Sequence, residues 1–246
     1  RNPLGSPDVI GFATGSYTGA LVSIIIVGGG YATTALGSLI GGIGTAIVVY
    51  LFAYRRGVQG FRLIIVGIGV SAMLSAINTW LVMTADLDVA MQAAVWGAGS
   101  LNGLGNEQLL PVAVCCAFLI PAAILCEPRM KMLELGDDAA SALGAASSRF
   151  GAGLLLLGVA LTAVATAAAG PISFVALAAP QIARRLTGSS SIGIIPSALL
   201  GALLLLIADI AAQRLFAPTQ LPVGVLTVVI GGCYFIWLLV REARRS

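Results

Sequence analysis

Residues that commonly act as metal ligands, nucleophiles or proton carriers are few in this chain. There is no histidine among the 246 residues, which excludes a pathway that binds bare transition-metal ions through imidazole. Four cysteines lie in or at the end of apolar runs and form no C-x-x-C pair: Cys115, Cys116, Cys126 and Cys233. They are interpreted as small packing residues, and no metal site is predicted.

One carboxylate, Asp209, lies inside an apolar run. An unpaired charge at the centre of a membrane helix costs about 2.5–3.5 kcal/mol on insertion scales, so Asp209 needs a partner such as Arg214 or free backbone amides. It is either a proton-coupling group or a satisfied structural carboxylate. The second interpretation is favoured because no histidine or second embedded acid offers a relay. The same shortage leaves no catalytic constellation for an intramembrane enzyme.

The polar segment 128–149 carries the strongest signal for an interaction site. A glycine is followed by two acidic residues, a small apolar face and a second glycine: Gly136, Asp137, Asp138, Ala139, Ala140, Leu143 and Gly144. Carboxylates at a helix start accept free amides and oppose the positive end of the dipole, and glycine often ends a helix. The pattern predicts a helix of about two turns, too short to be stable alone. It is interpreted as a docking surface, with a plain connector as the alternative.

The elements that position these residues are predicted to be membrane helices. Hydrophobic residues make up 59% of the chain and charged residues 9%, against about 45–50% and about 25% in soluble domains. Eight segments are apolar enough to be spans: 10–29, 34–54, 62–84, 108–126, 150–169, 172–187, 195–214 and 222–241. The sixth is short and contains Pro180, so it is expected to begin inside the protein. Helices are expected because lipid satisfies no backbone group.

Smaller features refine this arrangement. A short helix between Met91 and Gly105 is expected at the outer interface, with Trp96 as a headgroup-level anchor. The spacings Gly37-x-x-x-Gly41 and Ser197-x-x-x-Gly201 would allow helices to approach closely.

Basic residues recur after every second span and indicate the orientation. They are Arg55, Arg56, Arg62, Arg129, Lys131, Arg149, Arg184, Arg185, Arg241, Arg244 and Arg245. The positive-inside rule places these connections, and both ends of the chain, in the cytoplasm. The net charge of +3 is small and points to no nucleic-acid partner.

A nucleotide-binding motif is absent from the sequence. No G-x-x-x-x-G-K-[ST] occurs, and the only lysine, Lys131, follows no glycine loop. If ATP drives transport, the nucleotide must bind to another polypeptide. An ion-coupled secondary transporter is a different possibility, but beyond Asp209, Asn78 and Gln213 few embedded polar groups could coordinate an ion.

Four motifs in the same order resemble the FecCD-type permeases of ABC importers for iron–siderophores, haem and cobalamin. These are R-N-P-L-G-x-P at 1–7, L-G-D-D-x-A-x-x-L-G at 135–144, G-P-I-S-F-V-x-L-x-x-P-x-I-x-R at 170–184 and L-P-V-G-V-x-T at 221–227. Gln181 replaces the usual histidine, Ala176 the usual glycine, Gln220 the usual acidic residue, and Gly232-Cys233 the usual Ala-Pro.

The resemblance implies an all-α polytopic membrane protein with the ten-span type II ABC importer permease fold. This chain, 1–246, would be a single permease domain that lacks the first two spans. The chain opens at Arg1 without methionine, which fits a fragment. Expected partners are cytoplasmic ATP-binding subunits that carry ATP and Mg²⁺, a second permease copy or paralogue, an extracytoplasmic substrate-binding protein and the lipid bilayer.

The resemblance also assigns residues. The ATPase would dock on the 128–149 coupling loop, through Leu135, Gly136, Asp137, Asp138, Ala139, Ala140, Leu143 and Gly144. The translocation path would include Asn2, Pro3, Leu4, Pro7, Pro180, Gln181, Arg184 and Arg185. The expected function is ATP-driven import of iron–siderophore-type chelates, with haem or cobalamin as alternatives. The chain itself is expected to bind no cofactor and to catalyse no reaction.

Overall fold

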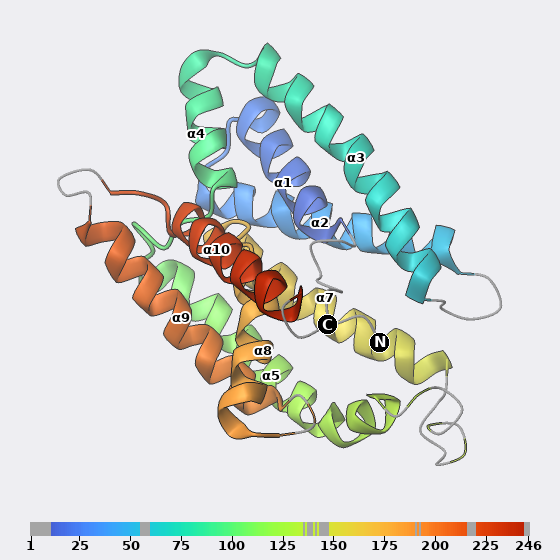
Figure 1. Cartoon of the computed structure of the whole chain (residues 1–246). Helices are drawn as coiled ribbons and strands as arrows, with labels where there is room; N and C mark the ends of the chain where they lie inside the picture. The colour runs from blue at the N-terminus through green and yellow to red at the C-terminus, as the bar shows by residue number, and fades with distance from the viewer. Residues whose placement is uncertain are drawn as a thin grey trace. The chain divides into compact units, whose positions relative to one another are not determined.

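The computed structural model has a helix within each segment that the sequence predicts to be a span (Figure 1). It describes residues 11–54, 60–134, 136, 140, 142, 148–189, 191, 193–215 and 220–243. Side chains are described as far as residue 233, except those of 60, 148 and 149. The helices, in chain order, are α1 (Phe12–Val22), the π-helical η2 (Ser23–Val27), α2 (Tyr31–Ala53), α3 (Gly60–Thr84), α4 (Leu87–Gly97), α5 (Asn106–Glu134), α7 (Ser148–Ala169), α8 (Val175–Thr187), α9 (Ile194–Arg214) and α10 (Val223–Ala243).

All eight segments predicted to be helical are helices, which confirms the all-α fold class. In the described part of the chain, α2, α3, α5, α7 and α9 are long and apolar enough to cross a membrane. The apolar stretches Phe12–Val27 and Val223–Cys233 are shorter. Helix α8 has 13 residues, about 20 Å at 1.5 Å per residue, against a hydrocarbon core of about 30 Å.

Several helix boundaries differ from the sequence prediction, and the differences are largest at α5 and α4. Helix α5 continues to Glu134 although Pro128 lies within it. A proline removes one backbone hydrogen bond and kinks a helix, but the turns on either side can remain helical. Helix α4 begins at Leu87, four residues before the predicted Met91. Asp88 in its first turn opposes the positive end of the helix dipole, which favours this earlier start.

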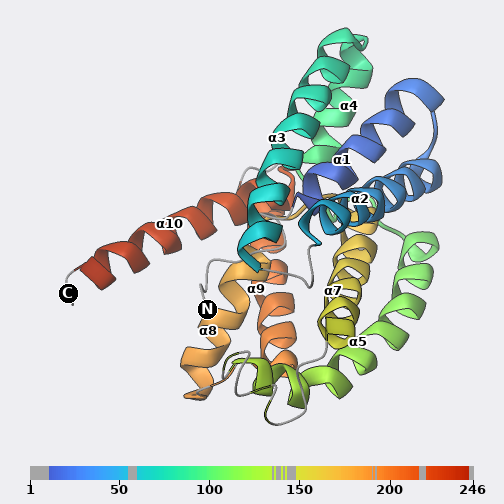
Figure 2. The ribbon, with the colours of Figure 1, turned by 90° about the vertical axis from the view of Figure 1, so that its right-hand side faces the viewer.

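The chain divides into two compact units, Arg1–Gly97 with Leu104–Pro171 and Ala98–Gly103 with Ile172–Ser246. The closest helix packing in the first unit is between α1 and α2, which lie against each other in Figures 1 and 2. Gly15 and Gly19 of α1 face Gly37 and Gly41 of α2. A Cβ atom at Gly19 would overlap the Gly37 carbonyl oxygen, and one at Gly41 would lie 2.9 Å from the Gly19 Cα. The predicted close approach at Gly37-x-x-x-Gly41 is confirmed.

Helix α4 is fastened to α1 through aromatic side chains. The rings of Tyr17 and Trp96 stack, with centroids 6.2 Å apart and planes 5° apart. The Tyr17 hydroxyl donates to the Ala93 carbonyl at 3.4 Å. Trp96 is half-buried by this stack, so it packs within the unit in addition to any contact with headgroups.

Helices α2 and α7 also pack together in the first unit. The Tyr31 hydroxyl at the start of α2 donates to the Ala168 carbonyl at the end of α7, at 3.0 Å. Since these residues are far apart in sequence, the bond fixes the two helix ends side by side.

The second unit consists mainly of α8, α9 and α10. Alanines of α8 face α9, where a Cβ atom at Gly201 would lie 3.5 Å from the Ala179 Cβ, an ordinary contact distance. The Gly224 amide at the start of α10 donates to the Gly99 carbonyl at 3.0 Å. This bond ties the short segment Ala98–Gly103 to α10.

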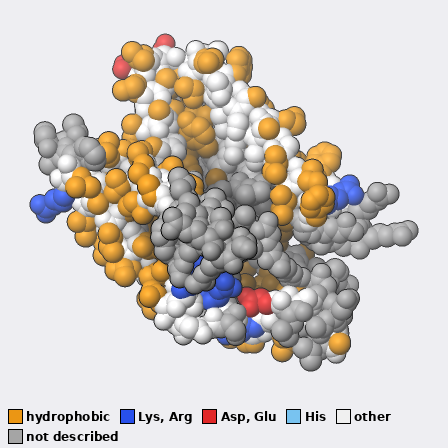
Figure 3. Space-filling view, in the orientation of Figure 1, with side chains coloured by type: hydrophobic (Ala, Val, Ile, Leu, Met, Phe, Trp, Pro, Cys, Tyr) orange, Lys and Arg blue, Asp and Glu red, His pale blue; other side chains and the backbone are white. Residues whose placement is uncertain are grey.

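Many large apolar side chains are exposed, as expected for helices that face lipid. Leu125, Met83 and Phe118 are 81%, 80% and 75% exposed. On the face shown in Figure 3, hydrophobic side chains cover much of the described surface and charged ones are few. Water would solvate this surface poorly, so a lipid environment accounts for it.

Candidate functional site

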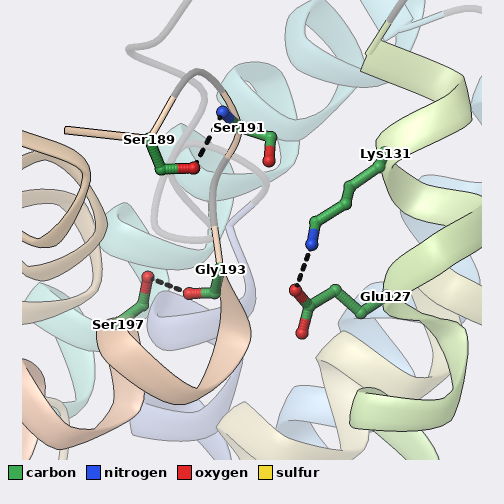
Figure 4. Close-up of polar contacts among 6 residues, drawn as sticks. All are labelled: Glu127, Lys131, Ser189, Ser191, Gly193 and Ser197. Carbon is green, nitrogen blue, oxygen red and sulfur yellow. Dashed lines mark hydrogen bonds and ion pairs between the residues drawn. The ribbon is translucent and has the colours of Figure 1, made fainter. Parts of the chain in front are cut away.

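The end of α5 leads into the segment predicted to dock an ATPase, residues 135–144, here called the docking segment. Lys131 reaches back one turn to Glu127, with Nζ 2.7 Å from Oε1 (Figure 4). The pair spans Pro128, where the helix lacks a backbone donor, and side chains four residues apart can stabilise a helix there. Helix α5 therefore extends towards the docking segment as an ordered support.

Three residues of the docking segment are described, and they agree with the predicted helix start. Gly136 has φ +106°, a backbone conformation that side-chain-bearing residues rarely adopt. The Ala140 amide donates to the Gly136 carbonyl at 2.9 Å, the spacing of a first helical turn. Ala140 is fully buried whereas Ala142 is exposed. These two described residues therefore differ in their exposure.

The other assigned docking residues lie outside the described residues. These are Leu135, Asp137, Asp138, Ala139, Leu143 and Gly144. Their docking role, and that of Gly136 and Ala140, stays a prediction.

A contact between side chains joins the two helices on either side of this segment. The Arg129 guanidinium carbon lies 5.3 Å from the centroid of the Phe150 ring. Arg129 is near the end of α5, Phe150 is in the first turn of α7, and the two helices pack together. The helix ends on either side of the docking segment are therefore neighbours in the first unit.

Four of the eight residues assigned to the translocation path are described, and all lie on α8. They are Pro180, Gln181, Arg184 and Arg185. They form two pairs spaced four residues apart, on adjacent rows of the helix. Pro180 and Gln181 are half-buried, and both arginines are exposed in the last turn. The remaining four, Asn2, Pro3, Leu4 and Pro7, lie outside the described residues.

Both ends of α8 have left-handed backbone, which is ordinary for the glycine after the helix and unusual for the phenylalanine before it. Phe174, before its first residue, has φ +69°, and Gly188 after its last has φ +61°. A Cβ atom at Gly231 of α10 would overlap the Phe174 side chain. Close packing of this ring on α10 compensates for a backbone conformation that costs a phenylalanine about 1–3 kcal/mol.

Serine side chains make local hydrogen bonds in the connection from α8 to α9. The Ser191 amide donates to the Ser189 hydroxyl oxygen at 3.3 Å, and the Ser197 hydroxyl donates to the Gly193 carbonyl at 2.6 Å (Figure 4). The Gly193 carbonyl also accepts the Ser197 amide at 3.2 Å, the first helical bond of α9.

Asp209 has a hydrogen-bond partner on its own helix. The Gln213 side-chain amide donates to the Asp209 carboxylate at 2.8 Å. The sequence suggested Arg214 or backbone amides as the partner, and Gln213 is the one that the structure shows. Among the described residues, no three His, Cys, Asp or Glu side chains are grouped to hold a metal ion.

Two features of the site could not be read from the sequence. Arg129 was noted only as a basic residue that marks orientation, and Phe150 was not singled out. Both flank the docking segment, so their position was a signal, but their pairing depends on α5 continuing past Pro128. The left-handed backbone at Phe174 had no sequence signal, because this conformation normally selects glycine or asparagine.

Comparison with known proteins gives a consistent result. The FecCD transport family matches residues 1–241. The ferric enterobactin transport system permease protein FepG of Escherichia coli is 53% identical over 246 residues, covering 100% of this chain and 74% of its own length. The probable siderophore transport system permease protein YfhA of Bacillus subtilis is 38% identical, covering 98% and 73%.

A solved structure agrees in fold. It is an inward-facing conformation of a metal-chelate type ABC transporter, with a TM-score of 0.89 and 28% identity over 98% of this chain and 77% of that chain. The family match over nearly all residues, the apolar helices and this likeness lead to one conclusion. The chain belongs to the FecCD transport family and is a multi-pass inner-membrane permease of the ABC type.

Proposed function

We propose that this chain is the membrane-spanning subunit of an ATP-driven importer for ferric siderophores. The 53% identity to the ferric enterobactin permease along the whole chain carries this proposal. The absence of histidine supports it, because a site for a bare metal ion would favour imidazole ligands. A chelate arrives with its metal already enclosed, and the permease then needs only a path for a large cargo.

ATP and Mg²⁺ would bind to separate cytoplasmic subunits, which dock on the segment 135–144. The φ of Gly136 and the buried Ala140 support a small ordered helix there. The cargo would pass between this chain and a second permease copy or paralogue after delivery by an extracytoplasmic binding protein. The basic residues Arg62, Arg129 and Arg184 mark the cytoplasmic side under the positive-inside rule.

A reconstituted system tests this function. The full-length permease, its partner ATPase and its binding protein are placed in proteoliposomes, with radiolabelled ferric enterobactin outside and ATP inside. We expect uptake that requires ATP, persists with a proton ionophore and disappears when the Walker lysine of the ATPase is replaced. Labelled haem and cobalamin, tested in parallel, should not accumulate.

Three results would contradict the proposal. Uptake that needs an ion gradient but no ATP would indicate a secondary transporter. Accumulation of haem or cobalamin in place of the ferric chelate would leave the transport class intact and replace the cargo. A chain that fails to co-purify with any ATPase would remove the proposed docking.

A further inference from the structure

The docking segment is anchored at its base by one contact between side chains. Arg129 and Phe150 lie on either side of the segment, and the guanidinium carbon is 5.3 Å from the ring centroid. A cation at this distance from an aromatic ring is attracted by the negative face of the ring. This contact joins the helix that enters the segment to the helix that leaves it.

Two charged neighbours of Arg129 on α5 pair with each other. The Lys131 Nζ lies 2.7 Å from the Glu127 carboxylate. Lys131 is also the basic residue in the last turn of α5, where it opposes the negative end of the helix dipole. Arg129 lies before that turn and places its planar guanidinium over the Phe150 ring.

The two ends of the segment are carried by α5 and α7. Ala140, a described residue between them, is fully buried. Helices α5 and α7 pack together. A push on the segment would reach both helices, provided that its two ends cannot separate.

We propose that Arg129 and Phe150 are positioning residues that clamp the base of the docking segment, so that ATPase movement displaces α5 and α7 as one body. This proposal rests on the proposed function and adds a mechanism to it. Neither residue needs to touch the ATPase or the cargo. Without the clamp, the ATPase would still bind and hydrolyse ATP, but less chelate would be transported for each ATP hydrolysed.

The test compares uptake per ATP hydrolysed in proteoliposomes containing the complete transporter. Phe150→Leu removes the ring face and keeps an apolar side chain, and Arg129→Met removes the cation and keeps the stem. Phe150→Tyr retains the ring face and is the matched control. We expect the first two variants to co-purify with the ATPase. Their uptake per ATP hydrolysed should fall about two- to fivefold, the change in an equilibrium constant that corresponds to the energy of an exposed cation–π contact. Phe150→Tyr should retain the wild-type ratio.

The double variant distinguishes a shared contact from two separate effects. If the residues act through each other, Arg129→Met in the Phe150→Leu background should cause little further loss. Multiplied losses in the double variant, or an unchanged ratio in both single variants, would overturn the clamp while wild-type uptake still supports the proposed function. Absence of ATP-dependent uptake in the wild type would instead overturn the proposed function and the clamp with it.

Discussion

Gly136 shows how a single backbone conformation can define the beginning of the docking segment. Its φ of +106° turns the chain between the end of α5 and the first helical bond of the segment, from Ala140 to Gly136. In a residue with a Cβ atom, this conformation brings the Cβ too close to the residue's own backbone and raises the energy. The space around Gly136 is open among the described residues, so conformation, and not crowding, requires the glycine.

Replacing Gly136 should therefore impair docking more than a change of side-chain size would suggest. Gly136→Ala is expected to disfavour the turn by about 1–3 kcal/mol and to lower the affinity for the ATPase by about fivefold or more. Binding of the purified ATPase to the permease in nanodiscs measures this. Gly153→Ala, in α7 with equally open surroundings, is the control and should bind normally. Wild-type affinity in Gly136→Ala would show that the turn does not position the docking surface.

Sequence patterns identified residue types at the site better than residue pairs. The glycine at 136 agrees with the predicted helix start, because short helices need a recognisable start; the predicted apolar face of Ala139, Ala140 and Leu143 stays a prediction. The partner of Asp209 was not, since Gln213 and Arg214 both follow within a turn or so and only the helix geometry selects Gln213. The pair formed by Arg129 and Phe150 depends on two helix ends that meet in space.

At the scale of elements, α1 and α2 are joined almost backbone to backbone. Gly15 and Gly19 face Gly37 and Gly41 with no room for a methyl group on the inner side. Close approach increases van der Waals contact, which drives helix association where lipid removes the hydrophobic effect. The pair is expected to move as a single rigid element.

Two glycines on the same helix provide a matched test of this packing. Gly41→Ala should destabilise the protein by about 1–3 kcal/mol, because the new methyl group would meet the backbone of α1. Gly44→Ala faces open space and should be neutral or stabilise by up to about 1 kcal/mol, the gain in helix propensity. Thermal unfolding of the purified permease in detergent compares them. Equal midpoints for the two variants would contradict the close α1–α2 contact.

The existence of the helices was predictable and their ends were less so. Every apolar segment of sufficient length formed a helix, since lipid leaves the backbone no other partner. Helix α5 ran through Pro128 to Glu134 because one missing hydrogen bond does not stop a helix supported on both sides. Where a helix ends in a polar stretch, composition alone does not show which residue is its last.

At the scale of the whole molecule, the proposed orientation rests on the basic residues that recur in every second connection between spans. The exposed Ala142 belongs to the docking segment, and the exposed Asp88 lies at the start of α4. One helix, α5, is long enough to cross the membrane between them. They should therefore lie on opposite sides.

Cysteine labelling tests this orientation directly. With Cys115, Cys116, Cys126 and Cys233 changed to alanine, the full-length protein receives either Asp88→Cys or Ala142→Cys. A membrane-impermeant maleimide applied to intact spheroplasts should label position 88 only. Position 142 should react after the membrane is permeabilised. The reverse pattern would invert the proposed topology, and labelling of both positions in intact spheroplasts would contradict a span between them.

The short length of α8 limits which parts of this protein can face lipid. Its 13 residues cover about two thirds of the hydrocarbon depth, and the preceding residues 171–174 have no regular helix. Non-helical backbone survives at that depth only when other protein or an aqueous cavity shields it from acyl chains. The start of α8 must accordingly be sheltered from lipid in the assembled transporter, whereas the broad apolar sides of α5 can meet the bilayer directly.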